Sequence, residues 1–109
     1  MTNANCPFCN LTHKTVVPTV HTNGTSAHEL RDQLQAAIEA LRTAQQKLEQ
    51  AAPNGRDYYP QGGTAQVSAL QSHDHRWMQL SRMLTELEEQ RDHVQSVLDF
   101  MEQNRAVRA

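Results

Sequence analysis

Two cysteines, Cys6 and Cys9, have the spacing of a metal-binding or redox pair. A redox Cys-x-x-Cys motif opens a helix after a buried strand, and the five residues before Cys6 do not provide one. A structural zinc site needs two further ligands, and His13 and His21 follow the pair along the chain. The motif therefore predicts Zn²⁺ bound by Cys6, Cys9 and His13, with His21 or a residue from elsewhere as the fourth ligand. The alternative is a reduced arm that binds no metal.

An Arg-Asp-Tyr-Tyr run places a guanidinium beside two aromatic rings, at Arg56, Tyr58 and Tyr59. Arginine binds phosphate through paired hydrogen bonds, and tyrosine rings stack on nucleobases. His73 and Arg76 lie one helical turn apart and can join the same site. The run also has a structural interpretation, in which the tyrosines close the open end of a helical hairpin and His73 is a hydrogen-bonded core residue. Both interpretations stay open.

A third candidate is the start of a helix at Thr25 and Ser26. Free backbone N–H groups and the helix dipole favour an anion at such a position. Within one hairpin this helix start lies about 40 Å from the Arg-Asp-Tyr-Tyr run, by the helical rise. A site that combines the two motifs therefore requires a head-to-tail pairing of two copies. Its ligand would be nucleotide-like, with a phosphate at the helix start and a base between the tyrosines.

The sequence offers no residue set for catalysis. It has no Ser/His/Asp order around a strained turn, no glycine-rich phosphate loop and no pair of facing carboxylates. Acidic residues of the C-terminal half fall mainly outside its apolar stripe and read as a solvated face. We therefore expect a protein without enzymatic activity, and no residue is assigned a catalytic role.

The spacing of apolar residues predicts two long helices that carry these candidates. Ser26 and Glu29 have the spacing of a capping box, and an apolar heptad pattern follows over residues 26–52. A Pro-Asn-Gly sequence ends this helix, and residues 53–63 form a connection rich in glycine and proline. A second heptad pattern, without Gly or Pro, predicts a helix over residues 64–105.

The predicted fold class is all-α, a long antiparallel helical hairpin that resembles a coiled coil. The hairpin covers residues 26–109, and an N-terminal arm with the Cys-x-x-Cys motif covers residues 1–25. Pro18 excludes a central strand in the arm, which we expect to be short and extended. The residues expected to be buried between the helices are Leu34, Leu41, Leu48, Trp77, Leu80, Leu84 and Leu87.

The second predicted helix is longer than the first, about 60 Å against about 40 Å. Folded back on the first helix, it would extend past it with an apolar surface formed by Val94, Val97, Leu98 and Met101. Either the arm, through Phe8, Val16, Val17 and Val20, or a second copy of the chain must cover this surface. We expect a homo-oligomer, most simply a two-fold dimer.

Charge and composition narrow the function classes. The formal net charge is −2, with 10 basic and 12 acidic residues interspersed along the chain. Non-specific nucleic-acid binding needs a basic face, so a nucleic-acid partner is not expected. No apolar run has the length of a membrane span, and residues 1–10 lack a signal-peptide core. We expect a cytoplasmic protein without a membrane partner.

Three segments together resemble a group of short, uncharacterised proteins from tailed phages and bacterial genomes. They are Val-His-Thr-Asn-Gly-Thr-Ser at residues 20–26, Pro-Asn-Gly-Arg-Asp-Tyr-Tyr-Pro-Gln-Gly at 53–62, and His73-x-x-Arg76. The resemblance covers about residues 18–90, and the cysteine-bearing residues 1–17 depart from it. It implies a phage or prophage setting, in which a phage-infected host cell would be the location, and no particular activity.

These features favour a non-enzymatic, phage-type accessory protein, an oligomer that binds a partner protein or a small anionic, nucleotide-like ligand. One alternative is a structural or assembly component of a virion that uses the hairpin as a coiled-coil spacer. A zinc-armed nucleic-acid regulator is a further alternative, against which the charge and the lack of helix-turn-helix spacing both count.

Overall fold

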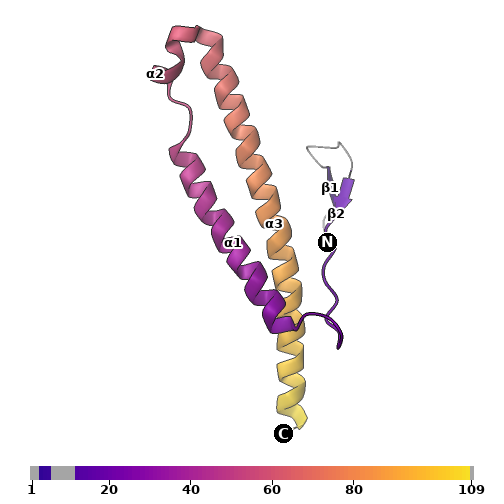
Figure 1. The fold of residues 1–109 in the computed structure, drawn as a ribbon. Helices are drawn as coiled ribbons and strands as arrows, with labels where there is room; N and C mark the ends of the chain where they lie inside the picture. Colours follow the sequence, from indigo (N-terminus) through magenta and orange to yellow (C-terminus); the bar gives the residue numbers. More distant parts are fainter. Residues whose placement is uncertain (1–2, 6–11, 109) are drawn as a thin grey trace.

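Two long antiparallel helices form the body of the protein. A computed structural model describes residues 3–5 and 12–108. Helix α1 (Ala27–Gln50) and helix α3 (Gly63–Arg108) make a rod of 71 × 29 × 22 Å (Figure 1). A short helix α2 (Gly55–Tyr58) and a 3₁₀ turn η1 (Tyr59–Gln61) join them. The predicted all-α helical hairpin is confirmed. None of the helices within the described ranges carries an apolar stretch long enough to cross a bilayer.

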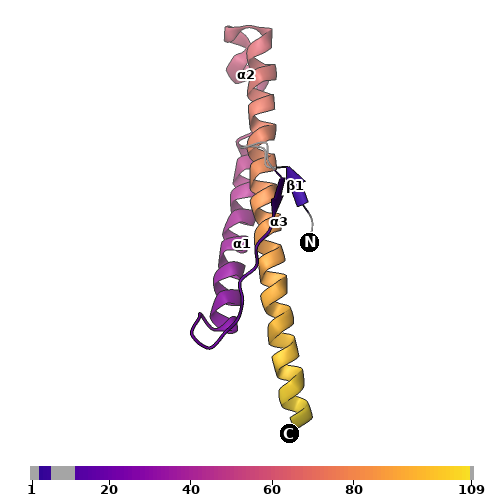
Figure 2. The ribbon, with the colours of Figure 1, turned by 90° about the vertical axis from the view of Figure 1, so that its right-hand side faces the viewer.

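The N-terminal region contains a short antiparallel strand pair. Strand β1 (Asn3–Asn5) pairs with strand β2 (Thr12–Lys14), with Ala4 opposite His13. Residues 15–20 have no regular secondary structure and lead alongside α3 to the start of α1 (Figures 1 and 2). A turn closes this segment, where the backbone N–H of Gly24 donates to the carbonyl of His21 at 3.1 Å.

Local hydrogen bonds set the helix boundaries. The Ser26 hydroxyl accepts from the backbone N–H of Glu29 at 3.2 Å, so Ser26 is the N-cap of α1 as predicted. After Pro53, the side chain of Asn54 accepts from the N–H of Arg56 at 3.0 Å and opens α2. Gly62 has φ of 104°, a conformation that favours glycine, and redirects the chain into α3.

The predicted core positions are only partly enclosed. All seven predicted residues, from Leu34 to Leu87, are half-buried. They face the other helix less completely than predicted, because none of them is fully buried. The fully enclosed side chains in the described part of the chain are Ile38 and Val94, each 0% exposed. Among the residues that the structure describes, the N-terminal arm covers only part of the helix pair, so much of the flank of each stripe is open to water.

The offset between the helices also differs from the prediction. Gln45 donates to Ser81 at 2.9 Å, and Arg91 donates to Gln35 at 3.0 Å, which fixes the register of α1 on α3. With this register, the first roughly three and a half turns of α3 extend beyond the end of α1, on the side of α2 and η1. The predicted offset placed all of the extra length at the other end.

Because of this register, Val94 and Leu98 are not left uncovered. They are 0% and 6% exposed, and they form a buried cluster with Ala27 at the start of α1. Val20 of the arm packs against the same cluster. The expectation that these two residues lie beyond the first helix is therefore wrong. Met101 does lie on the exposed end of α3, at 48% exposure.

Candidate functional site

A cavity lies at the loop end of the hairpin, in the region where α1 and α3 diverge (Figure 1). Its volume is about 350 Å³, and it is bounded by the end of α1, the segment before α2, α2 itself and the first turns of α3. Gly55 approaches the side-chain amide of Gln66 so closely that a Cβ there would lie 3.1 Å from it. This close contact seats α2 against α3 and holds Tyr58 at the cavity.

The walls of this cavity differ in chemistry. Leu48, Ala51 and Pro53, from the end of α1 and the segment after it, form an apolar wall. The wall formed by α3 is mainly polar and contains Ser68, Ser72, His73 and Arg76, with Ala69 among them. Tyr58 of α2 lies at the cavity as well. Three of the residues predicted to contact a ligand, Tyr58, His73 and Arg76, therefore line one cavity within a single chain.

His73 is the most informative of these residues. It is only 9% exposed, and within residues 3–5 and 12–108 no hydrogen bond reaches its imidazole. It was predicted to be a hydrogen-bonded core residue. The burial is as predicted, but the hydrogen bond is absent. Its ring nitrogens are not fully enclosed, so the imidazole can bond to water or to a molecule bound in the cavity.

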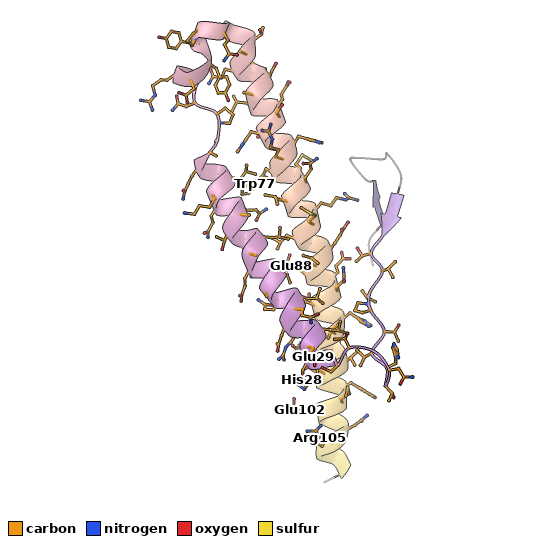
Figure 3. The ribbon with its side chains drawn as sticks, in the orientation of Figure 1. His28, Glu29, Trp77, Glu88, Glu102 and Arg105 are labelled. Carbon is orange, nitrogen blue, oxygen red and sulfur yellow. The ribbon has the colours of Figure 1, made fainter. Side chains whose placement is uncertain are left out.

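The charge at the cavity is positive. Arg76 is exposed, and it makes no ion pair with any residue whose position the structure gives. None of the nine residues that line the cavity is acidic. By contrast, Arg42 of α1 is neutralised by Glu88 of α3 at 2.8 Å, farther down the rod, where Glu88 lies between the helices (Figure 3). An anion is thus favoured over a cation at the loop end.

Four other predicted ligand residues lie outside this cavity. Arg56 and Tyr59 belong to the α2–η1 segment, but their side chains are exposed, and Tyr59 is 76% exposed. Thr25 and Ser26 lie at the opposite end of α1, and the Ser26 hydroxyl is used in capping the helix. Ser26 and the Arg-Asp-Tyr-Tyr run lie at opposite ends of α1, as the length of the predicted helix required. A site that combines them does not form within one chain.

The predicted zinc ligands are only partly visible. Cys6 and Cys9 lie outside the described residues, and of His13 only the backbone position in β2 is described. His21 is exposed, and its ring lies against Gly24, where a Cβ would approach Nε2 to 2.8 Å. Over the described ranges, no three His, Cys, Asp or Glu side chains come together as a metal site. That result does not bear on the predicted site, because it omits both thiols.

Two further hollows are less suited to a ligand. One has a larger volume, about 510 Å³, but it is a shallow surface lined by α3 alone, and it shares Ser68, Ser72 and Arg76 with the loop-end cavity. The other, of about 200 Å³, lies at the far end between α1 and α3. Its cations are offset there, because Arg31 pairs with Asp32 at 3.0 Å and Glu102 lies beside Arg105 (Figure 3).

Ser68 and Ser72 of the polar wall were not predicted as site residues. Ser68, Ser72 and Arg76 recur every fourth residue and therefore share one face of α3. That spacing could have identified them. No sequence pattern identified the apolar wall. The offset between the helices decides which residues of α3 lie opposite the end of α1, and the sequence does not show that offset.

Fold and site together define a class: an elongated helical hairpin with a cavity of mixed polarity at its loop end. Comparisons with protein-family models, with curated proteins and with solved structures gave no match.

Proposed function

We propose that the protein is a non-enzymatic binding module that holds a small anionic ligand in the loop-end cavity. The observation that carries the proposal is His73, which is buried at the cavity without a hydrogen-bond partner among the described residues. Arg76 adds a positive charge at the same wall, with no ion-pair partner in the described ranges and no acidic residue among the nine that line the cavity. A guanidinium and an imidazole N–H both donate to anionic oxygens.

The proposed ligand contacts differ from the composite site between two copies. The loop-end cavity needs only Tyr58, His73 and Arg76 of one chain, whereas the composite site needs Arg56 and Ser26 of different chains. Arg56 and Arg76 therefore make a matched pair, because each is an exposed arginine and only Arg76 lines the cavity.

Arg76→Gln is expected to weaken binding of inorganic phosphate at least tenfold, because it removes the one formal positive charge of the cavity wall. Arg56→Gln is the control and should change the dissociation constant less than twofold. The measurement is a titration followed by the indole N–H resonance of Trp77, the single tryptophan of the chain. Mass spectrometry of the denatured protein would test in parallel for an anion carried through purification. A loss of binding in Arg56→Gln alone would favour the composite site, and equal affinity in all three proteins would contradict both.

We propose a phage or prophage setting for this module. This proposal rests on the three segments that resemble tailed-phage proteins.

Self-association is also proposed, with a two-fold dimer as the simplest form. The exposed apolar surface that supports self-association is smaller than predicted, because Val94 and Leu98 are buried within the chain. The apolar side chains that stay exposed on α3 include Val67, Leu70, Met78 and Phe100.

Static light scattering at micromolar concentration tests self-association directly. A dimer should give twice the chain mass of 12.3 kDa. A mass of one chain would contradict self-association, and the exposed apolar side chains of α3 would then face water. The alternative role, a coiled-coil spacer in a virion, is favoured by the 71 Å length of the rod, and co-purification with capsid or tail would support it.

Zinc is proposed as a structural ion of the N-terminal arm, bound by Cys6, Cys9 and His13, with His21 or a residue from elsewhere as the fourth ligand. Protein purified without chelator should contain about one equivalent of zinc, since a four-ligand site with two thiolates binds Zn²⁺ tightly. Metal analysis and thiol titration provide the check. Two freely titratable thiols with less than about a tenth of an equivalent of zinc would contradict the proposal.

A further inference from the structure

The loop-end cavity has its apolar and its polar side chains on different structural elements, and this separation has a consequence for the ligand. The end of α1 and the residues after it contribute only Leu48, Ala51 and Pro53. Both groups of the cavity that can bind an anion by charge or N–H donation, His73 and Arg76, come from α3. An inorganic anion would contact α3 and leave the opposite apolar wall in contact with water.

We infer that the ligand is a small amphiphilic anion, with a flat apolar body and one phosphate or carboxylate group. The inference rests on the proposed function and narrows the class of molecule that the same site takes. The anionic group lies at His73 and Arg76, and the apolar body lies against Leu48, Ala51 and Pro53. Removing such a body from water is favourable, and the side chains of this wall carry no polar group that it would desolvate.

Tyr58 gives the site its preference for a flat body. Its half-buried ring lies at the cavity and belongs to α2, a helix of four residues between Asn54 and η1. Aromatic rings prefer offset-stacked or edge-to-face contacts with other rings, and the proposed planar body would make one of these contacts with Tyr58.

The size of the cavity limits the ligand. A volume of about 350 Å³ is near the lower end of the range for small-molecule sites, which runs from about 300 to 1,000 Å³. The polar wall continues onto the outer face of α3 through Ser68 and Ser72. A hydroxylated group attached to the anionic end can extend over those serines, whereas a second apolar body has no wall to contact.

Three probes separate the parts of this inference: phenyl phosphate, inorganic phosphate and benzyl alcohol. Phenyl phosphate carries both a flat body and an anion, and each of the others carries one of the two. Phenyl phosphate is expected to bind at least tenfold more tightly than inorganic phosphate, and benzyl alcohol to bind more weakly than phenyl phosphate. The titrations use the full chain and are followed by the Trp77 indole resonance and by calorimetry.

A pair of neighbouring alanines provides the variant and its control. Ala51→Leu adds bulk at the apolar side of the cavity and leaves the identities of His73 and Arg76 unchanged, so it should reduce the preference for phenyl phosphate over inorganic phosphate to less than twofold. Ala52 is exposed like Ala51 but does not line the cavity, so Ala52→Leu adds the same side chain outside it and should preserve the preference. Circular dichroism of both variants checks that the helices are intact.

The outcomes distinguish this inference from the proposed function. Equal affinity of the wild type for phenyl phosphate and inorganic phosphate would overturn the inference, while the anion site would stand if Arg76→Gln weakens both. Binding of neither anion would overturn both proposals. Equal affinity for benzyl alcohol and phenyl phosphate would also overturn both, because the anionic group would then contribute nothing.

Discussion

Ile38→Ala should lower the free energy of unfolding by about 3 kcal/mol, since truncations of enclosed isoleucine cost about 2–5 kcal/mol. Ile38 is 0% exposed, and it lies on α1 between Gln35 and Arg42, which both bond across to α3. The rod has few enclosed side chains to share the loss. For a stability of about 5–15 kcal/mol, this is a large fraction.

Thermal and urea unfolding followed by circular dichroism measure the change. The melting temperature should fall by roughly 12 °C, at about 4 °C or more for each kcal/mol in a chain of this size. Met78→Ala is the control, because Met78 is 66% exposed and its truncation should cost less than about 0.5 kcal/mol. If both variants unfold alike, Ile38 is not part of a rigid helix interface.

His73→Phe should have two opposite effects, a gain in stability and a loss of anion binding. The phenyl ring has nearly the shape of the imidazole and no polar atoms that need a partner. The imidazole makes no hydrogen bond to a side chain or backbone group of the described residues, so an apolar ring in this mostly buried place should raise the free energy of unfolding by about 1 kcal/mol, or the melting temperature by about 4 °C. Phosphate binding should weaken at least tenfold, because the N–H donor is lost.

The matched control is His75→Phe. His75 is exposed, contacts Gln79 at 3.0 Å and does not line the loop-end cavity. Its replacement should change the stability by less than about 0.5 kcal/mol and leave phosphate binding unaltered. If His73→Phe is instead less stable than the wild type, the imidazole contributes to folding through bound water, and the argument for a ligand at this ring fails.

Local sequence signals predicted the secondary structure well. The Ser26–Glu29 spacing located the start of α1, and the Pro-Asn-Gly sequence after residue 52 located its end to within two residues. The heptad pattern predicted α3 as one uninterrupted helix, which begins at Gly63 and continues to Arg108. These boundaries depend on caps and on residues that break helices, and both act over one turn of chain.

The offset between the helices could not be predicted in the same way. A heptad pattern fixes which face of each helix is apolar, but shifting one helix by a whole heptad preserves the pattern. Here the residues between α1 and α3 fold into α2 and η1, and cross-contacts such as Gln45–Ser81 set the register. That register decides that Val94 is buried and that Tyr58, His73 and Arg76 share a cavity.

Arg56 and Tyr59 were predicted to share a ligand site with Tyr58 because the three residues lie close together in the chain. In α2 and η1, successive residues point in different directions, so only Tyr58 faces the cavity. Adjacency in a helical segment separates side chains by about 100° around the axis, which is the physical reason that the motif divides.

The elongated shape affects how the protein behaves in solution. Its radius of gyration is 19.8 Å, whereas a compact chain of the same length has about 13 Å. A rod tumbles slowly about its short axes and sweeps a large hydrodynamic volume. A single chain should therefore elute from a gel-filtration column ahead of globular proteins of equal mass. Early elution alone would therefore not distinguish a monomer from a dimer. Sedimentation equilibrium would distinguish them, because it depends on mass and not on shape.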